Sequence, residues 1–288
     1  DYEFPDAFYP KQADIPKEEL FKQWDIKYKN YLDALENQPS IIGFEVDEPD
    51  LIRLNEEQGN QTWYSVKNLE TFMEWFSLNS KRKLPLRITP ASGTLFEEKE
   101  KYLEGIYKSY NGDIISGPNQ YVPAPDVYQY MAGYREYWEK NPDLNSSVWA
   151  LVSAHSDADA VGGMILDEEK IMQSVVAAVV AGSRGIGFYD NAFNCNSSSC
   201  SIDLADNGKI NAFGKTYEAV KAVVARIGTV KEALLGDDIG FGISGTIVYR
   251  RFKTGSKIYK FSFDLSGIKP ADISVFDYKG SKEKNIPI

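Results

Sequence analysis

The sequence predicts an α/β protein in which a parallel sheet is covered by helices and followed by a small antiparallel β unit. Short apolar runs alternate with amphipathic segments of about twelve or more residues, and parallel strands need such long crossover connections. After residue 236 the apolar pattern changes to a period of two, which is typical of antiparallel strands. We therefore expect a parallel α/β portion over residues 1–235 and a β-rich unit over residues 236–288.

The amphipathic segments carry apolar side chains at spacings of three and four residues, which places these side chains on one face of a helix. The clearest example begins at Lys17, and its apolar positions include Leu20, Trp24, Tyr28, Leu32 and Leu35. On this basis we expect helices at residues 17–38, 66–79, 97–110, 126–140, 167–181 and 213–235.

The apolar runs between these segments are too short to be helices. The first run contains the β-branched pair Ile41 and Ile42 and is stopped by Pro49, so we interpret it as a buried strand with an acidic end. The parallel strands are expected at residues 40–49, 84–89, 113–116, 148–153 and 185–189. The antiparallel strands are expected at residues 239–252, 257–265 and 273–278.

The charge balance narrows the range of partners. The chain has 42 acidic and 32 basic residues, which gives a formal net charge of −10. A chain of this sign is repelled by the phosphates of nucleic acids and by anionic lipid surfaces. No apolar stretch approaches the roughly 20 residues that cross a bilayer. We expect no nucleic acid partner, no membrane span and no cofactor.

The cysteines and glycosylation sequons point to an extracellular or cell-surface protein. Cys195 and Cys200 are the only cysteines and would close a small disulfide loop. A metal site is disfavoured, because two thiols need further ligands and the single histidine, His155, lies far away in sequence. Acceptor sequons for N-glycosylation begin at Asn60, Asn145 and Asn196. Sequons beside a disulfide favour an oxidising compartment.

The carboxyl ends of parallel strands are where α/β proteins place their sites, and polar residues gather there in this sequence. Along the chain the strand ends carry Glu45, Asp47 and Glu48, then Arg87 and Thr89, then Ser116, Asn119 and Tyr121, then Ser153, His155, Asp157 and Asp159, and last Tyr189, Asp190, Asn191 and Asn194. Carboxylates among aromatic and amide side chains suit sugar chemistry, because one carboxyl group can protonate a leaving oxygen while another stabilises or attacks the sugar carbon.

One motif carries a family resemblance. The segment Phe44-Glu45-Val46-Asp47-Glu48-Pro49 resembles the Asn-Glu-Pro ending of the fourth strand in the (β/α)₈-barrel glycoside hydrolases of clan A, with Asp47 in place of the asparagine. The later strand ends, at Arg87, Asn119, His155 and Asp190, resemble the fifth to eighth strands in order, followed by a β appendage. The resemblance implies a TIM-barrel-like fold.

The same resemblance implies roles for individual residues. Glu48 would be the general acid and base. The family places a nucleophilic glutamate at the end of the seventh strand, but this sequence has Ser153-Ala154-His155-Ser156-Asp157 there. Asp157, Asp159 or Asp190 would then act as base or nucleophile. The residues that would contact the sugar are Glu45, Asp47, Arg87, Asn119, Tyr121, His155 and Tyr189.

These residues also have structural interpretations. Asp47 and Glu48 could cap the start of the next helix, and Glu45 could pair with Arg87. His155 could cap a loop, and the other acids could be solvated turn residues. Trp24, Trp75, Trp138 and Trp149 lie on helix or strand patterns and are expected in the core.

Five parallel strands cannot close an eight-stranded barrel. Nothing before Ser40 has the pattern of three further strand and helix units. The missing strands would belong to a separate or removed amino-terminal segment or to another chain, or the five strands form an open sheet. We interpret the chain as the carboxyl-terminal portion of something larger.

Two functions follow from these patterns. The first is an extracellular glycosidase that cleaves O-glycosidic bonds by carboxylate acid and base catalysis. The second is a catalytically inactive barrel that binds carbohydrate or serves as a structural surface or assembly protein. The acidic motif favours the first, while the missing seventh-strand glutamate and the missing strands favour the second.

Overall fold

Among the described residues, the fold follows the predicted alternation of helix and strand, and the helix expected at residues 97–110 lies outside them. The computed structural model describes residues 15–40, 44–47, 53–55, 60–62, 66–82, 84, 86–89, 114–116, 119–120, 124–141, 146–153, 167–189, 212–277 and 282–286. The chain divides into two compact units, one made of residues 1–118 and 137–147 and the other of residues 119–136 and 148–288.

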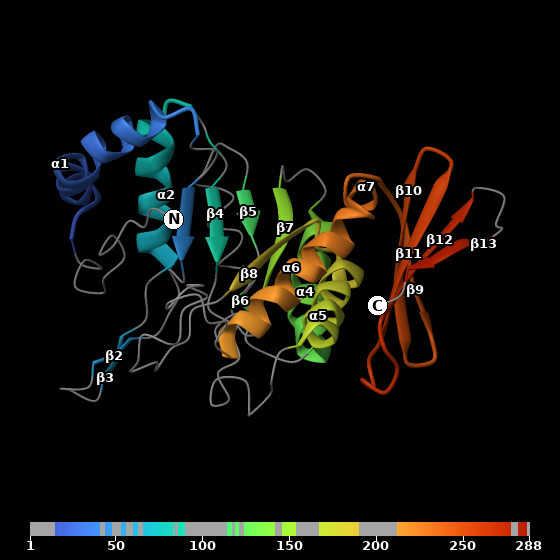
Figure 1. Cartoon of the computed structure of the whole chain (residues 1–288). Coiled ribbons are helices and arrows are strands. Elements are labelled where there is room, and N and C mark those ends of the chain that lie inside the picture. Colours follow the sequence, from blue (N-terminus) through green and yellow to red (C-terminus); the bar gives the residue numbers. More distant parts are fainter. Residues whose placement is uncertain are drawn as a thin grey trace. The chain divides into compact units, whose positions relative to one another are not determined.

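The first unit combines a short parallel sheet with two helices (Figure 1). Its strands β1 (Phe44–Asp47), β4 (Leu86–Thr89) and β5 (Ile114–Ser116) are parallel and lie in the order β1-β4-β5. Helices α1 (Lys17–Glu36) and α2 (Val66–Asn79) accompany them, and β2 (Arg53–Asn55) pairs with β3 (Asn60–Thr62) in a separate antiparallel hairpin. The structure confirms the predicted parallel arrangement of these strands.

Aromatic side chains join α1 to α2. The buried Trp24 ring meets the Phe72 ring edge to face at a centroid distance of 5.5 Å and the Trp75 ring at 6.1 Å. The Trp75 indole also donates a hydrogen bond to Asp25 Oδ1 at 2.9 Å. Edge-to-face pairs add to the free energy gained by burying the rings. The prediction that Trp24 and Trp75 are core residues is confirmed.

The second unit has helices between two sheets (Figure 1). One sheet is parallel and consists of β6 (Asn119–Gln120), β7 (Ser146–Ser153) and β8 (Gly185–Tyr189), with β7 paired to both neighbours. The helices are α4 (Ala124–Lys140), α5 (Glu168–Ala181), α6 (Ala212–Gly228) and α7 (Lys231–Leu234). The other sheet is antiparallel, in the order β13-β12-β11-β10-β9.

Helix α5 lies between these two sheets. Asp167 caps its start by accepting a hydrogen bond from the Lys170 amide at 3.0 Å. Gly182 ends it at a positive φ of 115°, a conformation that glycine adopts without strain. From Val175 to Ala181 every residue is buried. A helix that is apolar on all sides needs cover on all sides, which the antiparallel sheet helps to provide.

The antiparallel sheet has more strands than the sequence predicts. Its members are β9 (Asp237–Ser244), β10 (Ile247–Thr254), β11 (Lys257–Asp264), β12 (Asp272–Asp277) and β13 (Lys282–Ile286). The single strand expected at residues 239–252 is wrong, because Gly245 turns the chain with a φ of 62°. The helix expected at residues 213–235 is also interrupted, since a turn separates α6 from α7.

One face of this sheet packs against α5 through β10 and β11. Phe252 and Phe261 are buried there with ring centroids 5.7 Å apart. Arg250, which is only 6% exposed, donates from Nε to the carbonyl of Val180 at 3.1 Å and pairs with Asp238. This arginine satisfies a carbonyl near the end of α5 and holds the helix against β10.

Asp264 organises the turn after β11. Its carboxylate accepts hydrogen bonds from the Ser266 hydroxyl at 2.8 Å and from the amides of Ser266 and Lys269 at 3.1 and 3.0 Å. The Thr246 and Ser266 side chains, followed by these amides, lower the pKa of Asp264 to about 2. The residue is 1% exposed, so the turn depends on a buried carboxylate.

Asp264→Asn should destabilise the fold at neutral pH and should change its response to acid. The folded pKa lies below the ordinary value of 3.8, so the carboxylate contributes stability above about pH 4 that is lost as the pH falls towards 2. Urea unfolding between pH 7 and pH 2 is expected to show a difference between variant and wild type that shrinks over this window. The exposed Asp237 on β9 provides the control Asp237→Asn. A constant difference for Asp264→Asn would contradict the prediction.

Candidate active site

Strands β1 and β4 bring the predicted acidic end next to polar positions of the second strand. In their parallel register Glu45 is the partner of Arg87, and Asp47 is the partner of Thr89. Neighbouring strands lie about 4.8 Å apart, so the backbones of the two strand ends are adjacent. This register places Asp47 and Thr89 at the carboxyl edge of the sheet, where the sequence predicts the site.

The third strand of this unit continues the same edge. Ser116, the last residue of β5, is the register partner of Ile88 in β4. The edge is therefore formed in order by Asp47, Thr89 and Ser116. The structure brings together the ends of three strands that are separated in sequence by crossover connections.

The second unit has a corresponding edge. Ser153 ends β7 and is the register partner of Tyr189, which ends β8. On the other side of β7, Asn119 is the partner of Leu151 and Gln120 is the partner of Val152. Tyr189 thus lies at a carboxyl edge as predicted, and Asn119 lies on the strand that borders β7.

Several predicted site residues lie outside the described residues. They are Glu48, Tyr121, His155, Asp157, Asp159 and Asp190, together with Cys195, Cys200, Asn145 and Asn196. The sequon residue Asn60 begins β3 and is the register partner of Asn55. Among the described side chains, no group of three His, Cys, Asp or Glu could hold a metal ion. None of the described helices has the length and hydropathy needed to cross a membrane.

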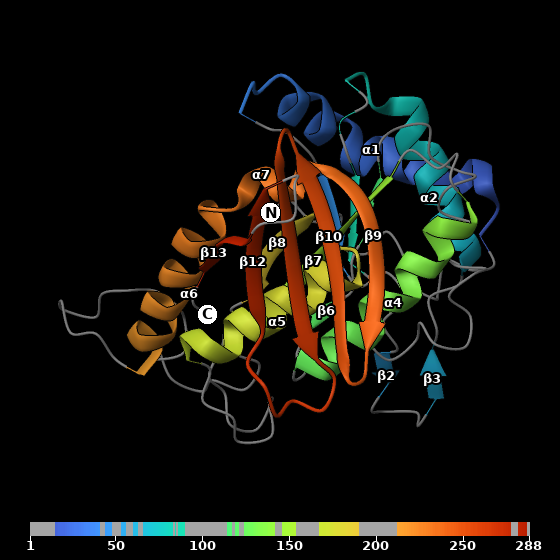
Figure 2. The ribbon, with the colours of Figure 1, turned by 90° about the vertical axis from the view of Figure 1, so that its right-hand side faces the viewer.

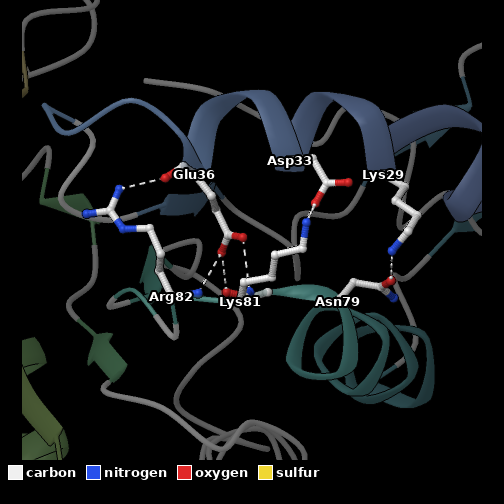
Figure 3. A network of polar contacts seen from close by, with 7 residues as sticks. Lys29, Asp33, Glu36, Asn79, Lys81 and Arg82 are labelled. Atoms are coloured by element: carbon white, nitrogen blue, oxygen red, sulfur yellow. Dashed lines mark hydrogen bonds and ion pairs between the residues drawn. The ribbon is translucent and has the colours of Figure 1, made fainter.

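A buried carboxylate ties together the two loops that lead into β1 and β4 (Figure 3). Glu36, at the end of α1, accepts hydrogen bonds from the Ser80 hydroxyl at 2.6 Å and from the Lys81 amide at 3.0 Å. Arg82 donates in return to the carbonyls of Glu36 and Gln38, each at 3.1 Å. One loop begins at the end of α1 and leads to β1, and the other begins at the end of α2 and leads to β4. The network therefore fixes the positions from which the chain enters the two strands.

An ion pair and a further hydrogen bond extend this network along the helices (Figure 3). The Lys81 ammonium donates to Asp33 Oδ1 at 2.5 Å, and Lys29 donates to Asn79 Oδ1 at 2.7 Å. This hydrogen bond, which Lys81 donates and Asp33 accepts, lowers the pKa of Asp33 and raises the pKa of Lys81. Both partners are solvent-accessible, and pairs of this kind orient side chains more than they stabilise the fold.

Ser183 holds the strands of the second unit in register. Its hydroxyl is fully buried, donates to the Gly185 carbonyl at 2.7 Å and accepts a hydrogen bond from the Ala150 amide at 3.1 Å. It thereby links the amino end of β8 to β7. The sequence does not single out Ser183, because a serine between a helix and a strand is common in loops.

Among the tryptophans expected in the core whose side chains the structure describes, Trp149 is the exception. Its side chain is 39% exposed, so the prediction is wrong for this residue. A Cβ added to its register partner Gly185 would lie 2.3 Å from Trp149 Cδ2, which means that the indole lies across the glycine. The residue stands four positions before the end of β7, or about 13 Å from the carboxyl edge. We therefore do not assign Trp149 to the site.

Gly185→Ala should lower the free energy of unfolding by about 1–3 kcal/mol, because the new methyl group would displace the Trp149 ring. Chemical denaturation followed by tryptophan fluorescence would measure the loss. Gly228→Ala is the matched control, since no atom lies within 4 Å of a Cβ added there. Equal stability of Gly185→Ala and the wild type would contradict the observed contact.

No family model and no curated protein sequence matches this chain. Among solved structures, Eubacterium rectale Amy13B is similar with a TM-score of 0.51 and 10% sequence identity, over 88% of this chain and 55% of that chain. A GH30 endoxylanase from Clostridium papyrosolvens has a TM-score of 0.47 and 10% identity, over 84% of this chain and 56% of that one. An α-amylase from Geobacillus thermoleovorans, solved with acarbose, has a TM-score of 0.46 and 11% identity, over 90% of this chain and 62% of that chain.

This chain therefore spans little more than half the length of the solved chains that it resembles. Amy13B, whose TM-score is above 0.5, is a TIM-barrel glycoside hydrolase. A sequence identity of 10–11% supports similarity of fold only. The predicted resemblance to (β/α)₈-barrel glycoside hydrolases is confirmed at the level of the fold.

Proposed function

We propose that this chain is the carboxyl-terminal part of a (β/α)-barrel glycoside hydrolase that cleaves O-glycosidic bonds in a polysaccharide or a glycoprotein glycan. The observation that carries the proposal is the register of β1 with β4, which aligns the acidic end of one strand with Arg87 and Thr89 of the next. Acidic and polar residues at the carboxyl edge of a parallel sheet are the arrangement from which barrel enzymes build their sites.

In the proposed mechanism Glu48, which directly follows β1, donates a proton to the glycosidic oxygen as the bond to the sugar carbon breaks. A second carboxylate, Asp157 after β7 or Asp190 after β8, either attacks the sugar carbon or takes a proton from the attacking water. A carboxyl separation of about 5–5.5 Å would give retention of configuration, and about 6.5–9.5 Å would give inversion.

The remaining strand-end residues would bind the sugar. Carboxylate, amide, guanidinium and imidazole groups can exchange hydrogen bonds with sugar hydroxyls, while tyrosine rings pack on the apolar faces of sugar rings. The residues to which we assign this role are Glu45, Asp47, Arg87, Asn119, Tyr121, His155 and Tyr189. Of these, Glu45, Asp47 and Arg87 occupy register positions on adjacent strands, which supports a common site.

An amino-terminal fragment or another chain would complete the barrel. Among the described strands, β1 pairs only with β4, and β8 pairs only with β7. Each therefore has one edge to which a further strand could add, and closure of a barrel removes such edges. Denaturing mass analysis of native material would detect an accompanying chain.

The compartment forms part of the same proposal. We assign the protein to the extracellular space or cell surface, with a disulfide between Cys195 and Cys200 and glycans at Asn60, Asn145 and Asn196. Intact mass before and after reduction, and before and after glycan removal, would test these assignments in secreted material. An unmodified mass with two free thiols would contradict them.

The direct test of activity is hydrolysis by the intact native protein. We expect the protein to release reducing ends from at least one member of a panel of neutral, acidic and sulfated polysaccharides. The release should require the fold and stop after heat denaturation. Binding to a polysaccharide without product formation would instead support the second candidate function.

That second candidate is a catalytically inactive carbohydrate-binding or assembly protein. It is favoured by the run Ser153-Ala154-His155-Ser156-Asp157, which lacks a glutamate at the strand end where the resembling family has its nucleophile. An inactive barrel would retain the substrate-binding residues without a second catalytic carboxylate. Product formation would exclude this candidate.

A further inference from the structure

Among the described residues, no helix of the second unit lies on one face of the C-terminal antiparallel sheet. Its opposite face packs on α5, and Figure 2 views the sheet from the uncovered side, with α5 and α6 behind it. Alternation along β10 separates the two faces, since Val248, Arg250 and Phe252 are buried against the helix while Tyr249 and Arg251 are more exposed. We call the side that carries Tyr249 and Arg251 the outer face.

Two positive charges oppose each other on the outer face. Arg251 of β10 and Lys260 of β11 are direct register partners in the antiparallel pair. Like charges directly opposite on neighbouring strands destabilise a sheet. The chain as a whole carries an excess of acidic residues, so a cross-strand pair of cations departs from the general composition.

Both cations gather around one aromatic ring. Lys260 Nζ lies 4.5 Å from the centroid of the Tyr249 ring, and the Arg251 guanidinium carbon lies 5.8 Å from it. The ring itself lies across β9, because a Cβ added to Gly242 would be 2.4 Å from Tyr249 Cζ. The three side chains therefore form a low platform on the sheet, which we call the Tyr249 platform.

Two acids of this sheet accept hydrogen bonds from serine side chains. Asp264 accepts hydrogen bonds from the Ser266 turn, and Asp272 accepts one from the Ser274 hydroxyl at 2.5 Å. Among the described residues, no carboxylate forms an ion pair with Arg251 or Lys260. Contact with the Tyr249 ring offsets part of the repulsion between the two cations, and the exposed Arg251 guanidinium can still donate to an oxyanion.

We propose that the Tyr249 platform binds an anionic polysaccharide, whose carboxylate or sulfate groups contact Arg251 and Lys260. Charge-assisted hydrogen bonds from guanidinium and ammonium groups suit such oxyanions, and the tyrosine ring offers an apolar surface to the sugar. At physiological ionic strength the Debye length is about 8 Å, so acids elsewhere on the chain are screened from the ligand. The platform uses no strand-end residue, and its test is independent of the proposed catalysis.

The experiment compares three polymers by affinity electrophoresis of the full native protein at physiological salt. Dextran and dextran sulfate share one backbone and differ in sulfate groups, while polygalacturonate presents carboxylates. We expect retardation by dextran sulfate, by polygalacturonate or by both, and none by dextran. The relative retardation in the two anionic gels distinguishes a sulfated ligand from a uronic acid ligand.

The double variant Arg251→Gln/Lys260→Gln should weaken binding about tenfold or more, since it removes two charge-assisted contacts. Lys257→Gln/Lys269→Gln changes the net charge equally at two exposed lysines of the same sheet and its turn, and it should alter binding less than twofold. Equal losses in the two double variants would overturn the proposal, as would equal binding of dextran and dextran sulfate or no retardation by either anionic polymer.

Arg251→Glu separates binding from folding. It converts the repulsive cross-strand pair into an attractive one, so its thermal midpoint should equal or exceed that of the wild type while anionic polysaccharide binding is lost. Retained binding in this variant would overturn the proposal. Glycan hydrolysis by the wild type does not depend on whether the Tyr249 platform binds a polysaccharide. The binding test and the hydrolysis test can therefore contradict the two proposals independently.

Discussion

Glu48→Gln is expected to lower the rate of glycan hydrolysis by roughly 10²–10⁴-fold. Glutamine has nearly the same shape as glutamic acid but cannot donate a carboxyl proton to the leaving oxygen. If Glu48 is the general acid, the loss should appear in kcat with little change in KM. It should be smaller for substrates with activated leaving groups, whose departure needs less protonation. Initial rates on a natural glycan and on an activated aryl glycoside would measure both effects.

Glu218→Gln is the matched control, because it makes the same chemical change at an exposed position of α6. Its turnover should equal that of the wild type. Circular dichroism of both variants would verify that the fold is retained. Unchanged turnover of Glu48→Gln on the natural substrate would remove this residue from the mechanism.

Arg250→Met is expected to lower the free energy of unfolding by about 2–4 kcal/mol. The buried guanidinium donates to the Val180 carbonyl at 3.1 Å and pairs with Asp238. Methionine can fill much of the space but cannot donate a hydrogen bond to either partner. The Val180 carbonyl would then remain buried without a donor, which costs free energy because the carbonyl has lost its hydrogen bonds to water. Urea denaturation monitored by fluorescence and circular dichroism would measure the change.

The neighbouring Arg251 gives the control for this prediction. It is exposed on the outer face, so Arg251→Met should change the free energy of unfolding by no more than about 0.5 kcal/mol. The two variants remove the same group from adjacent positions on opposite faces of one strand. Similar losses in both would show that Arg250 does not hold α5 in the way described.

The helices and parallel strands could be predicted because their signals are local. Helix α2 and strand β8 have the bounds that spacing predicted, and α1 begins at Lys17 as expected. Two patterns reflect the burial of apolar side chains: apolar residues spaced three and four positions apart, and short apolar runs that end at proline or glycine. Such patterns need no knowledge of distant parts of the chain.

The hairpin of β9 and β10 could not be predicted in the same way. Gly245 turns the chain, but Gly240 and Gly242 precede it within the same run, and nothing local distinguishes the glycine that turns. The break between α6 and α7 has a similar origin, because the apolar pattern continues through Val230, which remains buried. In both cases tertiary packing decides where the element ends.

The sequence predicts which edge of the sheet carries the candidate site, but it does not predict which residues lie next to one another there. Proline after an acidic run indicates where β1 ends, whereas the partnership of Glu45 with Arg87 follows from a register that forms only when the strands pair. Trp149 shows the same limit. Its exposure depends on a glycine that lies opposite it on another strand, and Ser183 gains its role only when β7 and β8 are side by side.

The position of α5 means that the C-terminal sheet is no detachable appendage. A chain cut at residue 236 would lose β9–β13 and uncover valine and alanine side chains that are inaccessible in the intact second unit. Aliphatic side chains that become exposed to solvent in this way promote self-association of the polypeptide. We therefore expect the shortened polypeptide to precipitate or to be degraded during expression, so any search for a minimal active fragment should retain the last fifty residues.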